Sequence, residues 1–176
     1  WDDDDVASVW ATPAIWTTFD LATDRDWQAK WITDNTSSPW LRKATELRAV
    51  QSRAMIYINV LGYFHLFING KRVGEDEFAP HVGQYDKRTF CITYDATQYL
   101  KEGRNSIGIW LGSGWSKGGA GVAVEPCVRA QLEMVDADGT ETTLTTDETW
   151  RAHPSSMSYR GKWCWNQFGG EEQRGD

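Results

Sequence analysis

The stretch LGYFHLFINGKRVG, residues 61–74, decides the fold class of this chain. From Phe64 to Ile68 apolar core-type residues occupy every second position, and a period of two is typical of a β-strand with one face in a core. Asn69 and Gly70 then interrupt the pattern, and both residues accept the positive φ angles of a tight type I′ turn. The stretch is therefore predicted to form a β-hairpin that buries its alternate apolar side chains.

Similar runs flank this hairpin on both sides. Strands are predicted within residues 40–50, 53–62, 89–100, 106–112 and 127–150, the last segment folding back at the turn DADG. Glycine, proline and polar residues separate the runs, and no segment keeps a 3.6-residue period over two helical turns. Residues 151–176 follow no period and are expected to be irregular. Short strands with this punctuation predict an all-β, jelly-roll-like antiparallel β-sandwich.

Composition narrows the classes of function. The chain has 176 residues and a formal net charge of −7, and it lacks a basic cluster, so nucleic acid is not an expected partner. No apolar run approaches the roughly 18 residues of a membrane span, and the first residues show no signal-peptide pattern. The 11 tryptophans favour flat aromatic surfaces of the kind on which sugar rings stack, although sandwich domains also use tryptophan as core filler.

The three cysteines are Cys91, Cys127 and Cys164. They lie far apart and form no CxxC pair, so a zinc site is not expected. Buried free thiols are the favoured interpretation, while a single disulfide stays open. The compartment therefore stays open: cytoplasmic, periplasmic or secreted.

Changes of composition divide the chain into three parts. Residues 1–23 are too short to bury their own aromatic side chains and are predicted to be the tail of a preceding β domain with its linker. Residues 24–172 form the predicted sandwich, which begins with the charged, tryptophan-containing joint DRDWQAKWI at residues 24–32. Residues 173–176 are predicted to begin a linker to further domains.

Five collinear blocks carry a resemblance to a known family. They are GYFHLFINGKRVG, FAPHVGQYDKRTFCITYDAT, LKEGRNSIGIWLGSGW, RAQLEMVDADGTETTLTTDETW and GKWCWNQFGGEE. In this order they resemble the N-terminal β-sandwich domain of bacterial α-L-rhamnosidases, the glycoside hydrolase family 78 enzymes. The resemblance covers roughly residues 26–172, and residues 1–22 look like the closing strand of a preceding fibronectin-III-like domain. It departs at residues 173–176, where the family's tyrosine and aspartate after GGE are replaced.

The resemblance implies a galactose-binding-domain-like sandwich that is an accessory part of a larger enzyme. The family removes terminal α-L-rhamnose with inversion, using two carboxylates on a separate (α/α)6 barrel that this chain lacks. The chain alone is therefore expected to be inactive, with no catalytic residues of its own. Its implied partners are the rest of the parent enzyme and rhamnose-containing carbohydrate, with no nucleic acid and no membrane. An autonomous carbohydrate-binding module and a purely structural docking spacer are the two alternatives.

Some related sandwich domains bind rhamnose through calcium, which an Asp-Asn pair holds just before the NGK hairpin. The corresponding residues here are Leu61-Gly62-Tyr63. Leucine and glycine have no side-chain oxygen, whereas calcium prefers several oxygen ligands. No metal site and no cofactor are therefore expected, and calcium stays open only through other ligands such as backbone carbonyls.

The remaining candidate residues come from loops. Aromatic rings and a cation that suit a saccharide are Tyr63, Tyr85, Trp115 and Lys117. A second set near the end of the chain is predicted to dock on the other domains of the enzyme: Trp163, Trp165, Asn166 and Phe168. The acidic residues lie in surface-like contexts and the three histidines are scattered, so neither group predicts a catalytic site.

Overall fold

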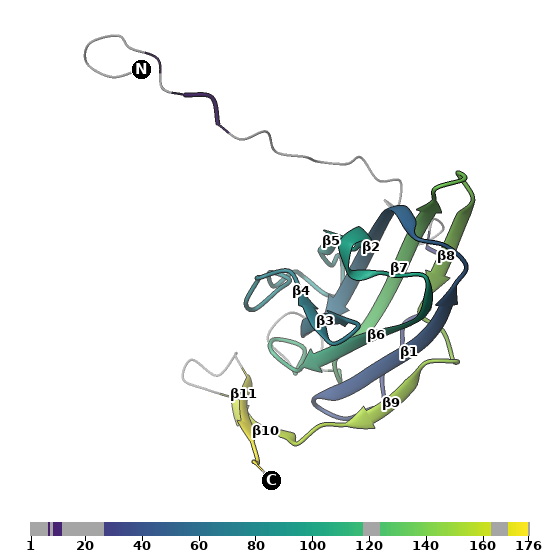
Figure 1. Cartoon of the computed structure of the whole chain (residues 1–176). Coiled ribbons are helices and arrows are strands. Elements are labelled where there is room, and N and C mark those ends of the chain that lie inside the picture. Colours follow the sequence, from purple (N-terminus) through teal and green to yellow (C-terminus); the bar gives the residue numbers. More distant parts are fainter. Residues whose placement is uncertain (1–6, 8, 12–26, 118–123, 163–168, 176) are drawn as a thin grey trace.

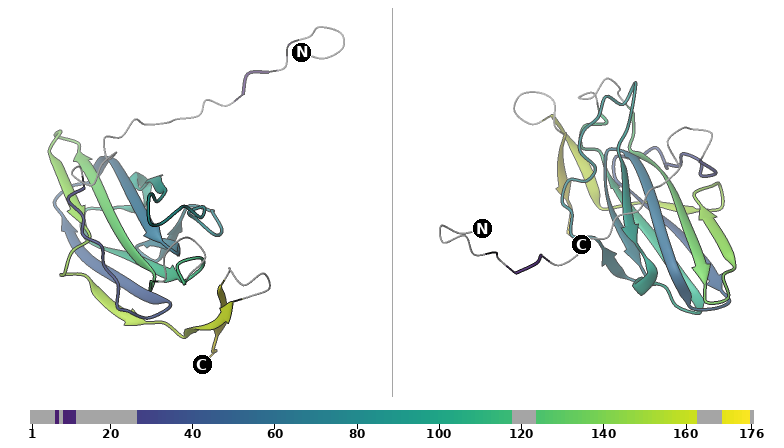
Figure 2. Two further views of the ribbon diagram at one scale, coloured as in Figure 1. Left: turned by 180° about the vertical axis from the view of Figure 1, so that it is seen from behind. Right: turned by 90° about the horizontal axis from the view of Figure 1, so that it is seen from above.

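The structure is a computed structural model, and it describes residues 7, 9–11, 27–117, 124–162 and 169–175. Two antiparallel sheets pack face to face (Figure 1; Figure 2, right). The five-stranded sheet has the order β4 (Lys71–Val73), β3 (Tyr63–Ile68), β6 (Gly103–Gly112), β1 (Pro39–Leu47) and β9 (Arg151–Pro154). The four-stranded sheet has the order β5 (Cys91–Asp95), β2 (Gln51–Leu61), β7 (Cys127–Asp136) and β8 (Glu141–Thr145). The predicted all-β sandwich is confirmed.

The core lies between the two sheets. Alternate side chains of the central strands point inward and are almost fully buried, among them Ile56 and Ile58 on β2 and Leu66 and Ile68 on β3. The residues between them point to the outer faces, as the period of two predicts. The sole helical element in the described part of the chain is the 3₁₀ turn η1 (Thr97–Tyr99), so no helix there is long and apolar enough to cross a membrane.

The predicted Asn-Gly turn joins β3 to β4. Asn69 and Gly70 have φ angles of +53° and +80°, so both adopt the left-handed conformation of the turn. The Asn69 side chain also donates to the Asn105 side-chain oxygen at 2.8 Å and accepts from the Ser106 backbone N–H at 3.0 Å. Asn105 is buried and donates to the carbonyl of Lys101 at 2.6 Å. These hydrogen bonds therefore join the Asn69-Gly70 turn to the start of β6, although the two segments lie far apart in the sequence.

The segment 27–32 packs on the outer face of the four-stranded sheet at Trp27 and pairs with β7 at Ile32. The Lys30 amide donates to the Thr146 carbonyl, and Ile32 exchanges two backbone hydrogen bonds with Val128 of β7. Trp27 is buried against Tyr57 of β2. The part of the predicted inter-domain joint that is described is therefore packed on the sandwich.

A guanidinium fastens this segment. The Arg129 guanidinium lies 4.5 Å from the ring centre of Trp27 and 5.0 Å from that of Trp31. Contacts of a cation with two indole rings stabilise the packing through the negative ring faces. The two tryptophans, four residues apart, thus both contact one guanidinium. We call the three side chains Trp27, Trp31 and Arg129 the clamp.

The prediction that residues 151–176 are irregular is wrong for most of the described part. β9 pairs with β1, and β10 (Met157–Lys162) pairs with β11 (Gly169–Gln173) in a separate two-stranded sheet. Figure 1 shows this small sheet beyond the end of β9, beside the sandwich. All four β9 residues are exposed, so backbone pairing alone defines the strand and no apolar period marks it in the sequence.

Two of the three cysteines are described. Cys91 and Cys127 are free and half-buried, and burial raises the pKa of each thiol to about 11. This agrees with the interpretation of them as buried free thiols. Cys164 lies outside the described residues, as does nearly all of the predicted fibronectin-III-like tail at residues 1–23.

Candidate functional site

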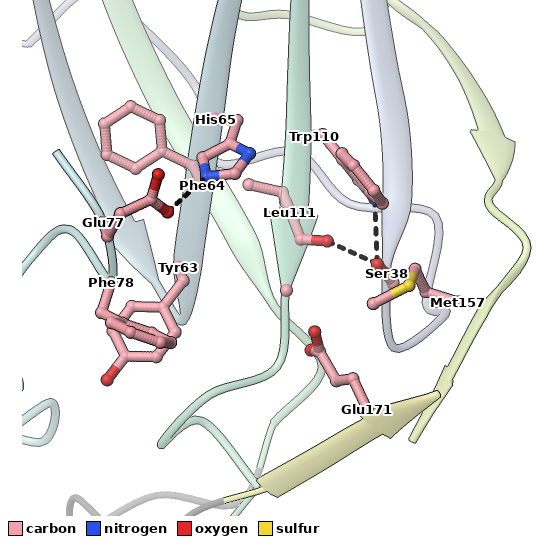
Figure 3. Close-up of a pocket in the computed structure, with 11 residues that line it drawn as sticks. Ser38, Tyr63, Phe64, His65, Glu77, Phe78, Trp110, Leu111, Met157 and Glu171 are labelled. Carbon is pink, nitrogen blue, oxygen red and sulfur yellow. Dashed lines mark hydrogen bonds and ion pairs between the residues drawn. The ribbon is translucent and has the colours of Figure 1, made fainter. Parts of the chain in front are cut away.

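A pocket opens on the outer face of the five-stranded sheet, where the small β10–β11 sheet approaches it (Figure 3). Its volume is about 180 Å³. Outward-facing residues of β3 and β6 form its floor, the loop after β4 forms one wall, and β10 with β11 forms the other. We call this cavity the outer-face pocket. Its polar and aromatic lining residues are Ser38, Tyr63, Phe64, His65, Glu77, Phe78, Trp110 and Glu171.

Trp110 is the central residue of the floor. It lies on the outward-facing side of β6 between Gly108 and Gly112, so no neighbouring side chain on its own strand covers the indole. Its Nε1–H donates to Ser38 Oγ at 3.0 Å, and Ser38 donates in turn to the Leu111 carbonyl at 2.8 Å. These two bonds hold the nitrogen-bearing edge of the ring in place.

One wall is an exposed ion cluster. The Arg72 guanidinium donates to Glu77 Oε1 at 2.8 Å, and His65 Nε2 lies 3.4 Å from Glu77 Oε2. The hydrogen bond from Arg72 lowers the pKa of the Glu77 carboxyl below its ordinary value. Glu77 is therefore ionised at neutral pH and can accept hydrogen bonds from a ligand.

Glu171 forms the opposite wall. It rises from β11 toward the end of β6, where it accepts a 2.7 Å hydrogen bond from the Ser113 backbone N–H (Figure 3). A Cβ atom at Gly112 would lie only 3.0 Å from Glu171 Oε1, so the glycine provides the space for this carboxylate. Burial raises the pKa of Glu171, because the charged form loses water.

Phe78 is an exposed aromatic residue at the rim. Its side chain is 66% exposed, and its φ angle of +55° is unusual for a residue with a bulky side chain. The ring meets Tyr63 edge-on at 5.6 Å. Residues with a strained backbone cluster at active sites and ligand-binding sites.

An aromatic strip, formed by Trp40, Phe67 and Trp110, continues from the pocket over three strands. Trp40 and Trp110 are register partners on β1 and β6, and their rings stack at 4.5 Å. The ring centres of Phe67 on β3 and Trp40 are 5.8 Å apart, because Gly108 on the strand between them has no side chain. Trp40 remains 37% exposed, so the strip is accessible from solvent.

The structure distributes the predicted saccharide residues unevenly. Tyr63 lines the pocket, while Trp115 and Tyr85 interact with Tyr63 but do not line the pocket themselves. Lys117 lies apart from the pocket lining, where it pairs with Glu125 and has its ammonium 5.6 Å from the Tyr159 ring centre. The predicted docking residues Trp163, Trp165, Asn166 and Phe168 are outside the described part of the chain.

Sequence reasoning missed most of the residues that line the pocket. A usable signal existed for Trp110 and His65, because both occupy outward positions between buried neighbours on their strands. No local signal marked Glu171, since its contact with Ser113 joins residues 58 positions apart. Phe78 and Glu77 lay in a segment that composition marks simply as a loop.

The place of the Asp-Asn pair is occupied by a tight backbone contact. Gly62 has a φ angle of +117°, and a Cβ atom there would lie 2.4 Å from the Gly112 carbonyl oxygen. A side chain of any kind at this position would therefore displace the end of β6. In the described ranges, no group of three or more His, Cys, Asp or Glu side chains is arranged to hold a metal ion.

Comparisons with known proteins agree with this architecture. A family model described as the α-L-rhamnosidase N-terminal domain matches residues 49–173. An α-L-rhamnosidase of Formosa agariphila is 33% identical over 173 aligned positions, which cover 86% of this chain and 19% of that protein. The chain spans about one fifth of the length of the first curated relatives that it matches.

Solved structures give the same result. The α-L-rhamnosidase of Dictyoglumus thermophilum superimposes with a TM-score of 0.71 at 27% identity, over 77% of this chain and 17% of that one. The Streptomyces avermitilis α-L-rhamnosidase in complex with L-rhamnose gives a TM-score of 0.66 at 32% identity, over 72% of this chain and 13% of that one.

Proposed function

Because the chain belongs to the α-L-rhamnosidase N-terminal domain family, we propose that it is a non-catalytic accessory domain that contacts carbohydrate in an enzyme releasing terminal α-L-rhamnose. The catalytic residues of that enzyme would lie on other domains, as the family resemblance implies. The relative crystallised with L-rhamnose makes this sugar the natural first ligand to test.

The observation that supports carbohydrate contact is the exposed aromatic strip beside the outer-face pocket. The apolar faces of a sugar ring pack on aromatic rings, while its hydroxyl groups need fixed donors and acceptors around them. Trp110 belongs to both the strip and the pocket and supplies an aromatic ring. Glu77 and Glu171 supply hydrogen-bond acceptors on opposite walls of the pocket. Tyr63 and Phe78 complete a hydrophobic edge at 5.6 Å from one another.

One feature of the pocket raises hydrolysis as a second candidate function. The pKa of Glu171 is raised and that of Glu77 is lowered, and opposite shifts in two carboxyls are typical of an acid and a base. Both groups are already engaged, however, Glu171 by the Ser113 amide and Glu77 by the Arg72 guanidinium. We therefore favour binding over hydrolysis for this pocket.

One experiment on the 176-residue chain separates these functions. The chain is titrated with L-rhamnose while tryptophan fluorescence and amide NMR shifts are followed, and a second aliquot is incubated with nitrophenyl α-L-rhamnoside. We expect a saturable response that Trp110→Ala removes, with no release of nitrophenol. Trp10→Ala is the matched control, because Trp10 is a 99% exposed indole that does not line the pocket.

Each part of the proposal has its own contradicting outcome. A titration that stays silent at millimolar sugar would contradict carbohydrate contact by this domain. Turnover of the nitrophenyl glycoside that Glu171→Gln abolishes would contradict the non-catalytic function and support hydrolysis in the pocket.

A further inference from the structure

A second depression lies on the outer face of the five-stranded sheet, on the far side of the aromatic strip from the pocket. Its volume is about 310 Å³. Basic side chains dominate its lining, which consists of Arg42, Lys43, Ala44, Arg104, Thr149 and Arg151. We call it the cationic depression.

Strand register explains why these cations converge. Arg42 on β1 is the direct partner of Arg151 on β9, and Ala44 is the partner of Ser106 on β6. Arg104 lies two residues before Ser106 and therefore on the same face of the sheet. The Ala44 methyl group makes a low floor, and the longer guanidinium side chains stand around it.

Cations gathered in this way repel one another, and a bound anion would relieve the repulsion. Like charges that face each other directly on antiparallel strands repel, as Arg42 and Arg151 must. Among the ion pairs between described residues, none involves Arg42, Arg104 or Arg151. The guanidinium of Arg42 donates to the Ser106 hydroxyl at 2.9 Å, which leaves its other N–H groups for a ligand.

Nearby carboxylates offset only part of this charge. Glu46 is the register partner of Arg104, and Asp147 interacts with Lys43, whose ammonium also bonds Thr149. Four cations against two carboxylates leave a local positive excess in a chain whose formal net charge is −7. An exposed cationic concavity on an acidic protein selects anionic ligands by long-range attraction.

The cationic depression and the aromatic strip are continuous. Trp40 and Arg42 are two residues apart on the same face of β1, a separation of about 7 Å. Arg42, Gly108 and Phe67 lie side by side across three strands. A ligand that covers both must therefore present rings to stack and an anionic group to pair with guanidinium.

We propose that this face binds an anionic saccharide, with sugar rings on the aromatic strip and a carboxylate or sulfate in the cationic depression. The proposal rests on carbohydrate contact as the proposed function of the domain and names the class of carbohydrate. Arginine suits both groups because its planar N–H fork pairs with two oxygens at once. Single-stranded nucleic acid also combines rings with anions, but the acidic chain lacks the wider basic surface that such binding needs.

Calorimetric titration of the 176-residue chain tests the proposal with four probes. They are oligogalacturonate for carboxylate, dextran sulfate for sulfate, neutral dextran of matched length, and a single-stranded DNA oligonucleotide. We expect at least one anionic saccharide to bind more tightly than dextran, with an affinity that falls as salt rises. Double substitution Arg42→Gln/Arg151→Gln should weaken that binding about tenfold or more, through loss of charge-assisted hydrogen bonds.

The matched control is Arg48→Gln/Arg53→Gln, which removes the same charge at two exposed arginines outside the depression. It should leave the affinity within about twofold, since distant surface charges are screened. The proposal is overturned if neither anionic saccharide binds better than dextran, if the Arg42/Arg151 double variant binds unchanged, or if DNA binds more tightly than both. If the anionic-saccharide proposal fails but dextran or rhamnose still binds, carbohydrate contact remains supported. If neither sugar binds, carbohydrate contact fails as well.

Discussion

The two outer faces of the sandwich are covered in different ways. On the four-stranded sheet, Trp27 and Ala29 of the segment 27–32 pack over Tyr57 of β2, which is only 3% exposed. On the five-stranded sheet, the described chain leaves Trp40 37% exposed and places the small β10–β11 sheet at one end only. The chain thus covers one aromatic face with its own residues and leaves the other accessible. The accessible face is therefore the one on which the proposed carbohydrate would bind.

The largest expected effect tests whether the covered face contributes more to the free energy of unfolding than the accessible face does. Tyr57→Ala should lower the free energy of unfolding by about 3–5 kcal/mol, because it empties a buried aromatic site. Phe67→Ala on the accessible face is the matched change and should cost roughly 1 kcal/mol or less. Urea unfolding of both variants measures the difference. Equal losses would show that the two faces are equally structural.

A smaller effect concerns the clamp that holds the segment 27–32 on the four-stranded sheet. Arg129→Met removes the cation between Trp27 and Trp31 and should lower stability by about 1–2 kcal/mol. Hydrogen exchange should quicken at the amides of Lys30 and Ile32, which bond to the sheet. Arg53→Met, an exposed arginine on the same sheet, is the control. Unchanged exchange in Arg129→Met would show that backbone pairing alone holds the segment.

The smallest effect concerns Glu171, which links the accessible face to β11. Its raised pKa means that the folded chain binds this proton more tightly than the unfolded chain does, so the contribution to stability is present at low pH. That contribution is lost as pH rises from the ordinary value of 4.5 through the raised pKa. Glutamine stays neutral at every pH, so Glu171→Gln should avoid this loss and stabilise the chain slightly at neutral pH.

The measurement is the difference in unfolding free energy between Glu171→Gln and the parent chain across this range of pH. The difference should grow in favour of the variant as pH rises. Glu77→Gln gives the opposite sign, because the pKa of Glu77 is lowered and its contribution disappears as pH falls. A difference that stays flat for Glu171→Gln would show that burial does not penalise its charge.

Much of the sandwich was predictable because its signals are local. Alternation over Phe64–Ile68 and the Asn69-Gly70 turn determine strands, faces and one hairpin without long-range information. The edge strand β9 was not predictable in the same way, since all its residues are exposed and the sequence shows no apolar alternation there. The outer-face pocket was least predictable, because Ser38 and Trp110 are 72 positions apart and meet only after both sheets have formed.

The contact at Gly62 restricts how this domain can diverge. Its left-handed backbone and the nearby Gly112 carbonyl exclude a side chain, so an ion-binding Asp-Asn pair is not reachable here by substitution alone. Acquiring it would require the β2–β3 corner and the end of β6 to change together. If the domain recognises sugar as proposed, selection would act more readily on the exposed sheet face, where neither Trp40 nor Arg42 is enclosed by a tight backbone contact.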